Sequence, residues 1–322
     1  MKMKDSGLYY DCGAGIFCTD GHYEEDRYAA IHIAEHNGHA ALFDTAHNAS
    51  LPYVLRTLNE IGIKKGNVDY ICLTHVHLDH AGGAGLYMRE FPNAKLVVHP
   101  KGAFHMEDPS ILMESVKSVY GEEQTELLYG NVLPIEKNRI IAPEDGETLP
   151  FGDKGICCFY TLGHAKHHMS FFEENSGALF AGDAFGLSYS WMTPAGTDWT
   201  EGLRWTIPTT SPTQFDPLAS IESYNQILKR AEGKVYLTHF GELRIVEENA
   251  ALLTEEIKDH VEIAIAAKGD EKTIKERLAG YYGSLCEKFN TPLPKATIEE
   301  SLAEAIELNA QGLAFWYTMK RK

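Results

Sequence analysis

The sequence predicts an α/β protein in which two groups of strands are followed by a run of helices. In the first half, a strand-like run at 69–73 leads to a helix from Ala84 and then to a strand-like run at 95–99. A second group of strand-like runs occupies 155–162, 169–172 and 178–181. After residue 245, apolar residues recur at helical spacing over 246–268, 270–282 and 296–316. Alternation of strands with helices is typical of layered α/β folds.

Composition narrows the classes of function. The 322 residues carry a formal net charge of −17. Lysine and arginine are scattered, which argues against binding to nucleic acid or to an anionic membrane surface. The longest apolar runs are much shorter than a membrane span, and no apolar segment of a signal peptide follows Met1. The six cysteines lack the spacing of a disulfide framework, so we expect a cytoplasmic protein.

The N-terminal part reads as strands followed by a helix. Residues 8–44 contain short strand-like runs, the clearest at 29–34 and 39–44 with a turn between them. Ser50 belongs to a residue type that caps helices, and Pro52 suits a first helical turn. A helix is therefore expected to begin at this point.

The segment Thr74-His75-Val76-His77-Leu78-Asp79-His80 carries the clearest functional signal. It lies on the loop between the strand at 69–73 and two glycines that precede a helix. Imidazole and carboxylate groups are ligands for zinc, iron and manganese. On such a loop, His75 and His77 can bind one ion while Asp79 and His80 reach a second. Because each ion needs at least three protein ligands, further ligands are expected elsewhere in the chain.

This segment resembles the signature of the metallo-β-lactamase-fold superfamily. Three further blocks follow in the order found in that family: Gly163-His164-Ala165-Lys166-His167-His168, Ala181-Gly182-Asp183-Ala184 and Leu237-Thr238-His239-Phe240-Gly241. The resemblance implies an αββα sandwich over residues 1–245, with a helical insert at about 105–130. Residues 246–322 would form a helical C-terminal extension that packs on the core, lines the cleft or makes a homodimer.

The resemblance also implies a ligand set for two divalent ions, with zinc expected and iron or manganese as alternatives. His75, His77 and His164 would hold the first ion. Asp79, His80 and His239 would hold the second, and Asp183 would bridge the two. His168 and Asp44 would support the site without binding metal, although Asp44 could equally cap a helix or turn. His167 has no assigned role.

The function that the family implies is hydrolysis of a small-molecule ester, thioester or lactone. A hydroxide between the two ions would attack the substrate, and Asp79 could orient it or carry a proton. The aromatic stretch 185–205 follows Asp183, so Tyr189, Trp191 and Arg204 are candidate substrate contacts, with Arg204 binding an anionic group. A wall that only covers the core is the alternative for this stretch. The 105–130 insert would be a lid or simple packing.

Two other functions remain open from the sequence. An iron-dependent persulfide dioxygenase would use the same ligand blocks for redox chemistry. A non-catalytic sensor could keep the fold and bind metal or a ligand without turnover. His260, in the middle of a helix beyond residue 245, is expected to be exposed.

Overall fold

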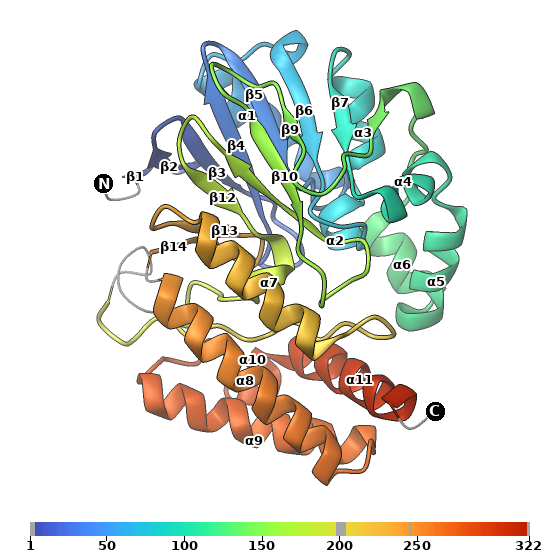
Figure 1. The fold of residues 1–322 in the computed structure, drawn as a ribbon, viewed down its shortest axis with the longest axis vertical. Coiled ribbons are helices and arrows are strands. Elements are labelled where there is room, and N and C mark those ends of the chain that lie inside the picture. The colour runs from blue at the N-terminus through green and yellow to red at the C-terminus, as the bar shows by residue number, and fades with distance from the viewer. Residues whose placement is uncertain (1–3, 198–203, 245, 321–322) are drawn as a thin grey trace.

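The computed structural model of the chain describes residues 4–197, 204–244 and 246–320. Two mixed β-sheets pack face to face, and helices cover their outer faces (Figure 1). The αββα sandwich with a C-terminal set of helices is therefore confirmed. Within the described residues, none of the helices has the length and apolarity that a membrane crossing requires.

The first sheet holds eight strands in sequence order. They are β1 (Lys4–Asp5), β2 (Tyr10–Gly13), β3 (Ile16–Asp20), β4 (Ala30–His36), β5 (His39–Phe43), β6 (Val68–Cys72), β7 (Lys95–Val97) and β8 (Ile140–Ile141). Strands β1 to β5 pair antiparallel, and β5 to β8 pair parallel. Parallel pairs need crossover connections, and helices provide them here.

The second sheet has six strands in the order β14-β13-β12-β11-β10-β9. They are β9 (Thr148–Leu149), β10 (Ile156–Tyr160), β11 (Met169–Glu173), β12 (Ala178–Phe180), β13 (Val235–Leu237) and β14 (Gly241–Leu243). Only β12 and β13 pair in parallel among these described strands. Helix α7 runs between these two strands in the sequence and supplies their crossover.

Helices flank the sandwich on both sides (Figure 1). The α-helices are α1 (Leu51–Glu60), α2 (Leu78–Ala81), α3 (Ala84–Glu90), α4 (Pro100–Glu107), α5 (Ser110–Tyr120), α6 (Glu122–Tyr129), α7 (Pro217–Arg230), α8 (Val246–Ala266), α9 (Glu271–Phe289), α10 (Ile298–Ser301) and α11 (Ala303–Lys320). Short 3-10 helices are η1 (Asn48–Ser50), η2 (Lys65–Asn67), η3 (Lys137–Arg139) and η4 (Gly182–Phe185). Helix α7 begins where the Asp216 side chain accepts hydrogen bonds from two backbone amides, a standard N-cap.

Three apolar clusters hold the layers together. Between the sheets, Phe43 of β5 stacks on Phe180 of β12 with ring centroids 3.6 Å apart. A second cluster joins the outer face of the first sheet to α1 and α3. The third joins the second sheet to α7, α8, α9 and α11. The C-terminal helices therefore share a core with the sheet that carries His164, Asp183 and His239, three of the seven candidate ligands.

Candidate metal centre

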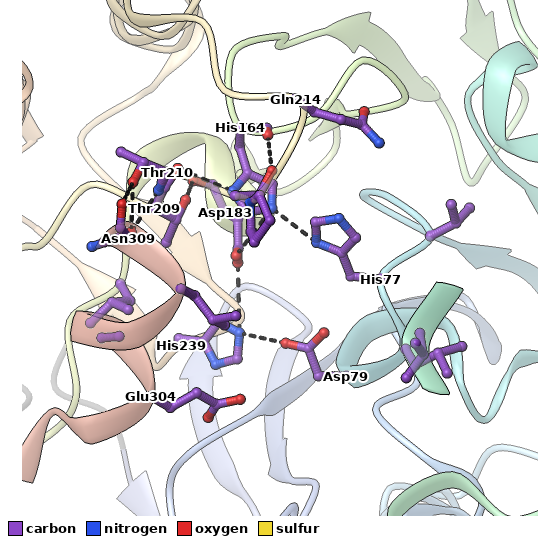
Figure 2. A pocket seen from close by; sticks show the side chains of 18 of the residues that line it. His77, Asp79, His164, Asp183, Thr209, Thr210, Gln214, His239, Glu304 and Asn309 are labelled. Carbon is purple, nitrogen blue, oxygen red and sulfur yellow. Dashed lines mark hydrogen bonds and ion pairs between the residues drawn. The ribbon is translucent and has the colours of Figure 1, made fainter. Parts of the chain in front are cut away.

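The predicted ligands converge although they come from distant parts of the chain. Figure 2 shows His77, Asp79, His164, Asp183 and His239 at the cavity. His75, His77, Asp79 and His80 lie on the segment that runs from the end of β6 through α2. The remaining three belong to the second sheet: His164 follows β10, Asp183 lies in η4 after β12, and His239 follows β13. Strand ends from both sheets thus build one site.

The first histidine group consists of His75, His77 and His164. His75 Nε2 lies 2.9 Å from His77 Nδ1, and His164 Nε2 lies 3.1 Å from the same His77 atom. Three imidazole nitrogens so close together have few uses other than binding a shared ion. Burial, and then the neighbouring imidazoles, lower the pKa of His75 and His77 well below the usual value, so both rings are neutral and can offer a lone pair.

The second group consists of Asp79, His80 and His239. Asp79 Oδ2 lies 3.2 Å from His239 Nε2 and 3.3 Å from His80 Nε2. Burial lowers the pKa of His80, but the carboxylates, Asp79 foremost, raise it well above its ordinary value. Negative charge therefore gathers around this group, and a bound cation would neutralise it.

Asp183 lies between the two groups. Its Oδ1 is 3.3 Å from His80 Nε2 and 3.7 Å from His239 Nε2, while its Oδ2 is 3.6 Å from His164 Nε2. Burial opposes its ionisation, but the surrounding histidines hold the pKa of Asp183 below its usual value. Among the described residues, neither Asp183 Oδ1 nor His80 Nε2 has a hydrogen-bond partner. These buried atoms fit metal ligation, because orphaned polar atoms in a dry interior are otherwise costly.

The hydrogen bonds of the ring nitrogens that point away from the site show which nitrogen of His164 and His239 can bind metal. His164 Nδ1 donates to the backbone carbonyl of Thr209 at 3.1 Å, and His239 Nδ1 donates to that of Tyr28 at 2.8 Å. A carbonyl can only accept, so Nδ1 carries the proton in both rings. The Nε2 atom of each ring then faces the site and is the nitrogen left to bind a metal.

Asp44 supports His80 from behind. Its Oδ2 lies 2.8 Å from His80 Nδ1 and accepts a hydrogen bond of 2.7 Å from the Thr238 hydroxyl. Its Oδ1 accepts from the Thr74 amide at 2.8 Å. The side chain is 1% exposed and joins the two ligand-bearing segments on which His80 and His239 lie.

His168 contacts the site through the backbone. The Asp183 amide donates to His168 Nε2 at 3.2 Å, and His168 Nδ1 lies 2.9 Å from the Thr161 hydroxyl. Both ring nitrogens are therefore occupied by protein groups. His167 lines the cavity, with its Nδ1 3.5 Å from the Val76 amide and its Nε2 3.4 Å from Gln214 Nε2. Burial lowers the pKa of His167 to about 3, so its ring is neutral.

Comparison with known proteins agrees with this arrangement. The family model of the metallo-β-lactamase superfamily matches residues 26–239. The chain belongs to this superfamily. The match includes the whole of both histidine groups and ends on His239.

Individual relatives are distant. ST1585, a metallo-β-lactamase fold-containing protein of Sulfurisphaera tokodaii, is 28% identical over 221 residues, which are 66% of this chain and 78% of ST1585. Its crystal structure gives a TM-score of 0.61 and covers 89% of this chain and 93% of that chain, at 22% identity. TTHA1429 of Thermus thermophilus, a metallo-β-lactamase family protein, gives a TM-score of 0.62 at 19% identity, with coverage of 97% and 95%. These two structures share the fold with this chain.

A further relative carries a named activity. The N-acyl homoserine lactonase of Bacillus thuringiensis is 26% identical over 195 residues, which are 58% of this chain and 61% of the lactonase. The aligned part therefore falls short of two thirds of either protein.

In this member of the metallo-β-lactamase superfamily, a cavity of ≈ 430 Å³ opens onto the two groups. The 105–130 insert lines it with Leu112, Ser115, Val116 and Tyr129, among others. The C-terminal extension lines it with Glu304, Ala305, Leu308 and Asn309. Among the described residues on its wall there is no lysine or arginine.

The three candidate substrate residues differ in position. Tyr189 lines the cavity, with its ring 5.2 Å from that of Tyr28. Trp191 instead lines a neighbouring pocket. Arg204 is 1% exposed, and its Nη2 donates to the carbonyls of Phe240 and Glu242, so its expected contact with a substrate anion is wrong. Residues 198–203 of the same stretch lie outside the described residues.

Sequence reasoning missed several residues at the cavity. Thr209, Glu304 and Asn309 carry no motif and lie far along the chain from the histidine blocks. The only sequence signal was the position of Thr209, which comes shortly after the aromatic stretch that follows Asp183. Contacts from a C-terminal helix depend on tertiary packing, which a single sequence does not encode locally.

Proposed function

We propose that the chain is a dinuclear metal-dependent hydrolase that cleaves a small-molecule ester, thioester or lactone. The position of Asp183 carries the proposal, because its two oxygens face two separate histidine groups at one end of the cavity. Zinc suits these imidazole and carboxylate ligands, and iron or manganese accepts the same set. The likeness to an N-acyl homoserine lactonase supports hydrolysis of a lactone or related ester.

The bound ions and Asp79 would have different roles in the reaction. Two divalent ions bound in the two groups would lower the pKa of water to about 7 and polarise the carbonyl under attack. Asp79 handles the proton: its side chain is 25% exposed, lines the cavity and lies 3.2 Å from His239. A partly exposed carboxylate can take a proton from water and pass it to the leaving oxygen or sulfur.

The cavity wall narrows the class of substrate. Leu112, Val116 and Leu187 supply apolar surface for an acyl chain or the carbon skeleton of a lactone. Glu304 adds a carboxylate, which accepts a hydrogen bond from the Tyr28 hydroxyl, and the described residues of the wall include no lysine or arginine. An anionic substituent on the substrate would meet like charge at Glu304. We therefore expect substrates without a carboxylate or phosphate beyond the reacting group.

A substrate panel tests this proposal. The metal-loaded full chain would be assayed on esters, thioesters and lactones, each in a neutral and a carboxylate-bearing form. Hydrolysis of at least one class is expected, with higher kcat/KM for the neutral form. Asp183→Ala should lower turnover by more than about 100-fold, because even outer partners of ligands are worth 10–100-fold.

Asp26→Ala is the matched control for that variant. Asp26 belongs to another Asp/His group with Asp20 and His22, but its side chain is 82% exposed, far more than that of Asp183. Its replacement should leave turnover unchanged. Failure of the fully metal-loaded wild type to hydrolyse any member of the panel would contradict the proposed activity.

A further inference from the structure

Residues 208–211, here called the strap, lie directly behind the metal centre. The Thr209 carbonyl accepts the hydrogen bond from His164 Nδ1 at 3.1 Å. The Thr209 hydroxyl donates to the backbone carbonyl of Asp183 at 2.9 Å. The Ser211 hydroxyl donates to the backbone carbonyl of His164 at 2.5 Å. The strap therefore orients one candidate ligand and holds the backbone of another.

Asn309, on helix α11, holds the strap in turn (Figure 2). Its Oδ1 accepts from the Thr210 amide at 2.7 Å, and its Nδ2 donates to the Pro208 carbonyl at 2.9 Å. The Thr210 hydroxyl also donates to the Asn309 backbone carbonyl at 2.9 Å. One buried amide side chain thus bonds the backbone on both sides of Thr209.

Two further contacts fix the amide and the strap. The Asn309 amide also donates to the Tyr282 hydroxyl on α9 at 2.9 Å, so both of its N–H groups and its oxygen are used. A Cβ added at Gly312 would lie 2.0 Å from the Thr210 carbonyl oxygen. Helix α11 therefore packs backbone to backbone against the strap, at a distance that only glycine permits at that position.

We propose that Asn309 is a positioning residue for the metal centre, acting through the strap on His164 and Asp183. The inference rests on the proposed function, since it assumes that these two side chains bind metal. Partners of metal-bound histidines set the orientation and basicity of the ring. Here the partner is the Thr209 carbonyl, and its position depends on a helix more than 90 residues away in the chain.

Metal affinity of the full-length protein tests the inference. Competition with a chromophoric chelator would be measured for the wild type and Asn309→Ala, and Co²⁺ absorption would report the ligand geometry. We expect Asn309→Ala to weaken binding roughly 10- to 100-fold, the usual effect of losing an outer partner, and to change the Co²⁺ spectrum. Tyr282→Phe, which removes a single hydroxyl behind the amide, should shift affinity in the same direction by less.

Leu278→Ala is the control for lost stability. Leu278 is a fully buried α9 residue of the same apolar cluster, so its truncation destabilises the extension without removing a polar contact. Its metal affinity and Co²⁺ spectrum should match those of the wild type. If Asn309→Ala fails to fold, Tyr282→Phe decides between the outcomes.

Each result has a distinct meaning. Wild-type affinity and spectrum in a folded Asn309→Ala, or in Tyr282→Phe where Asn309→Ala does not fold, would overturn the inference and leave the proposed function intact. A loss in Leu278→Ala equal to that in the tested variant would also overturn it, because general destabilisation would then be the cause. Absence of metal binding by the wild type would overturn the proposed function and the inference together.

Discussion

The side chains behind the ligands determine what the histidines can do. A spacing such as H-x-H-x-D-H identifies the residues, but it does not reveal which ring nitrogen is protonated. In the structure, the Tyr28 and Thr209 carbonyls hold protons on the Nδ1 atoms of His239 and His164. Their Nε2 atoms therefore face the shared centre and are the nitrogens available to a metal.

Asp44→Asn tests the support of His80. The amide would replace a carboxylate that accepts from Thr238 and Thr74 and faces His80, and its NH2 group would face donors. We expect metal affinity to fall roughly 10- to 100-fold. Chelator competition on the full chain would measure the effect.

Asp69→Asn is the matched control for this change. Asp69 also pairs with a histidine, His39 at 3.0 Å, but the His39 side chain is 50% exposed and that of Asp69 is 36% exposed. The control should bind metal as the wild type does. Equal affinities for all three proteins would show that Asp44 plays no part in the centre.

At the residue scale, the sequence predicted the candidate ligands, but it did not predict the burial of individual side chains. The histidine and aspartate blocks could be found because their spacing is local and specific. The expected exposure of His260 was wrong, since its side chain is fully buried, with its Nε2 2.6 Å from the Tyr282 hydroxyl. That burial comes from α9, and the periodicity of α8 alone does not contain it.

At the scale of elements, the long helices and the strands beside the ligand blocks were predictable, including the three-residue strands β7 and β12, but some other short strands were not. Strands β8, β9 and β14 have two or three residues and are held by pairing with neighbours. Helix α9 runs to Phe289, beyond the predicted end at 282, although Gly283 weakens its helical signal. Buried Leu285 and Cys286 extend it, because tertiary packing outweighs local propensity.

Helix α8 carries a buried acid that makes stability depend on pH. Glu256 is 2% exposed, and its carboxyl oxygens have no hydrogen-bond partner among the described residues. Burial, followed by nearby Asp259, raises its pKa well above the ordinary value. The folded chain thus keeps a proton that the unfolded chain releases above about pH 4.3.

Glu256→Gln should therefore stabilise the protein at neutral pH. The contribution of protonated Glu256 to the free energy of unfolding is fully present below about pH 4.3, the pKa of an unfolded glutamate. It is lost as the pH rises from there toward the pKa of Glu256 in the folded chain. The wild type should lose about 1.4 kcal/mol per pH unit in that window relative to the variant. Thermal unfolding at several pH values would measure the gap.

The control for that change is Glu262→Gln, an exposed acidic residue on the same helix. It should follow the pH dependence of the wild type. If the Tm of Glu256→Gln changes with pH in the same way as the Tm of the wild type, Glu256 does not hold a proton in the folded chain.

At the scale of the whole molecule, the C-terminal helices pack on the sandwich and line the cavity at the candidate metal centre. They share an apolar cluster with the second sheet, and Glu304 and Asn309 of α11 reach the cavity. The sequence indicated a helical extension that packs on the core, lines the cleft or makes a homodimer, and the structure shows the first two. The residues that make these contacts could not be named, because they are far apart in the chain. The sandwich itself was predictable through the family resemblance, whose blocks mark the strand ends.

The number and identity of bound metals test the account most directly. Elemental analysis of the purified full chain, after loading with Zn²⁺, Mn²⁺ or Fe²⁺ and removal of excess ion, should find two divalent ions per chain. Asp183→Ala should hold fewer, since its carboxylate faces both groups. A wild type that retains no metal, or a single iron together with oxygen consumption on a persulfide, would contradict the dinuclear hydrolase.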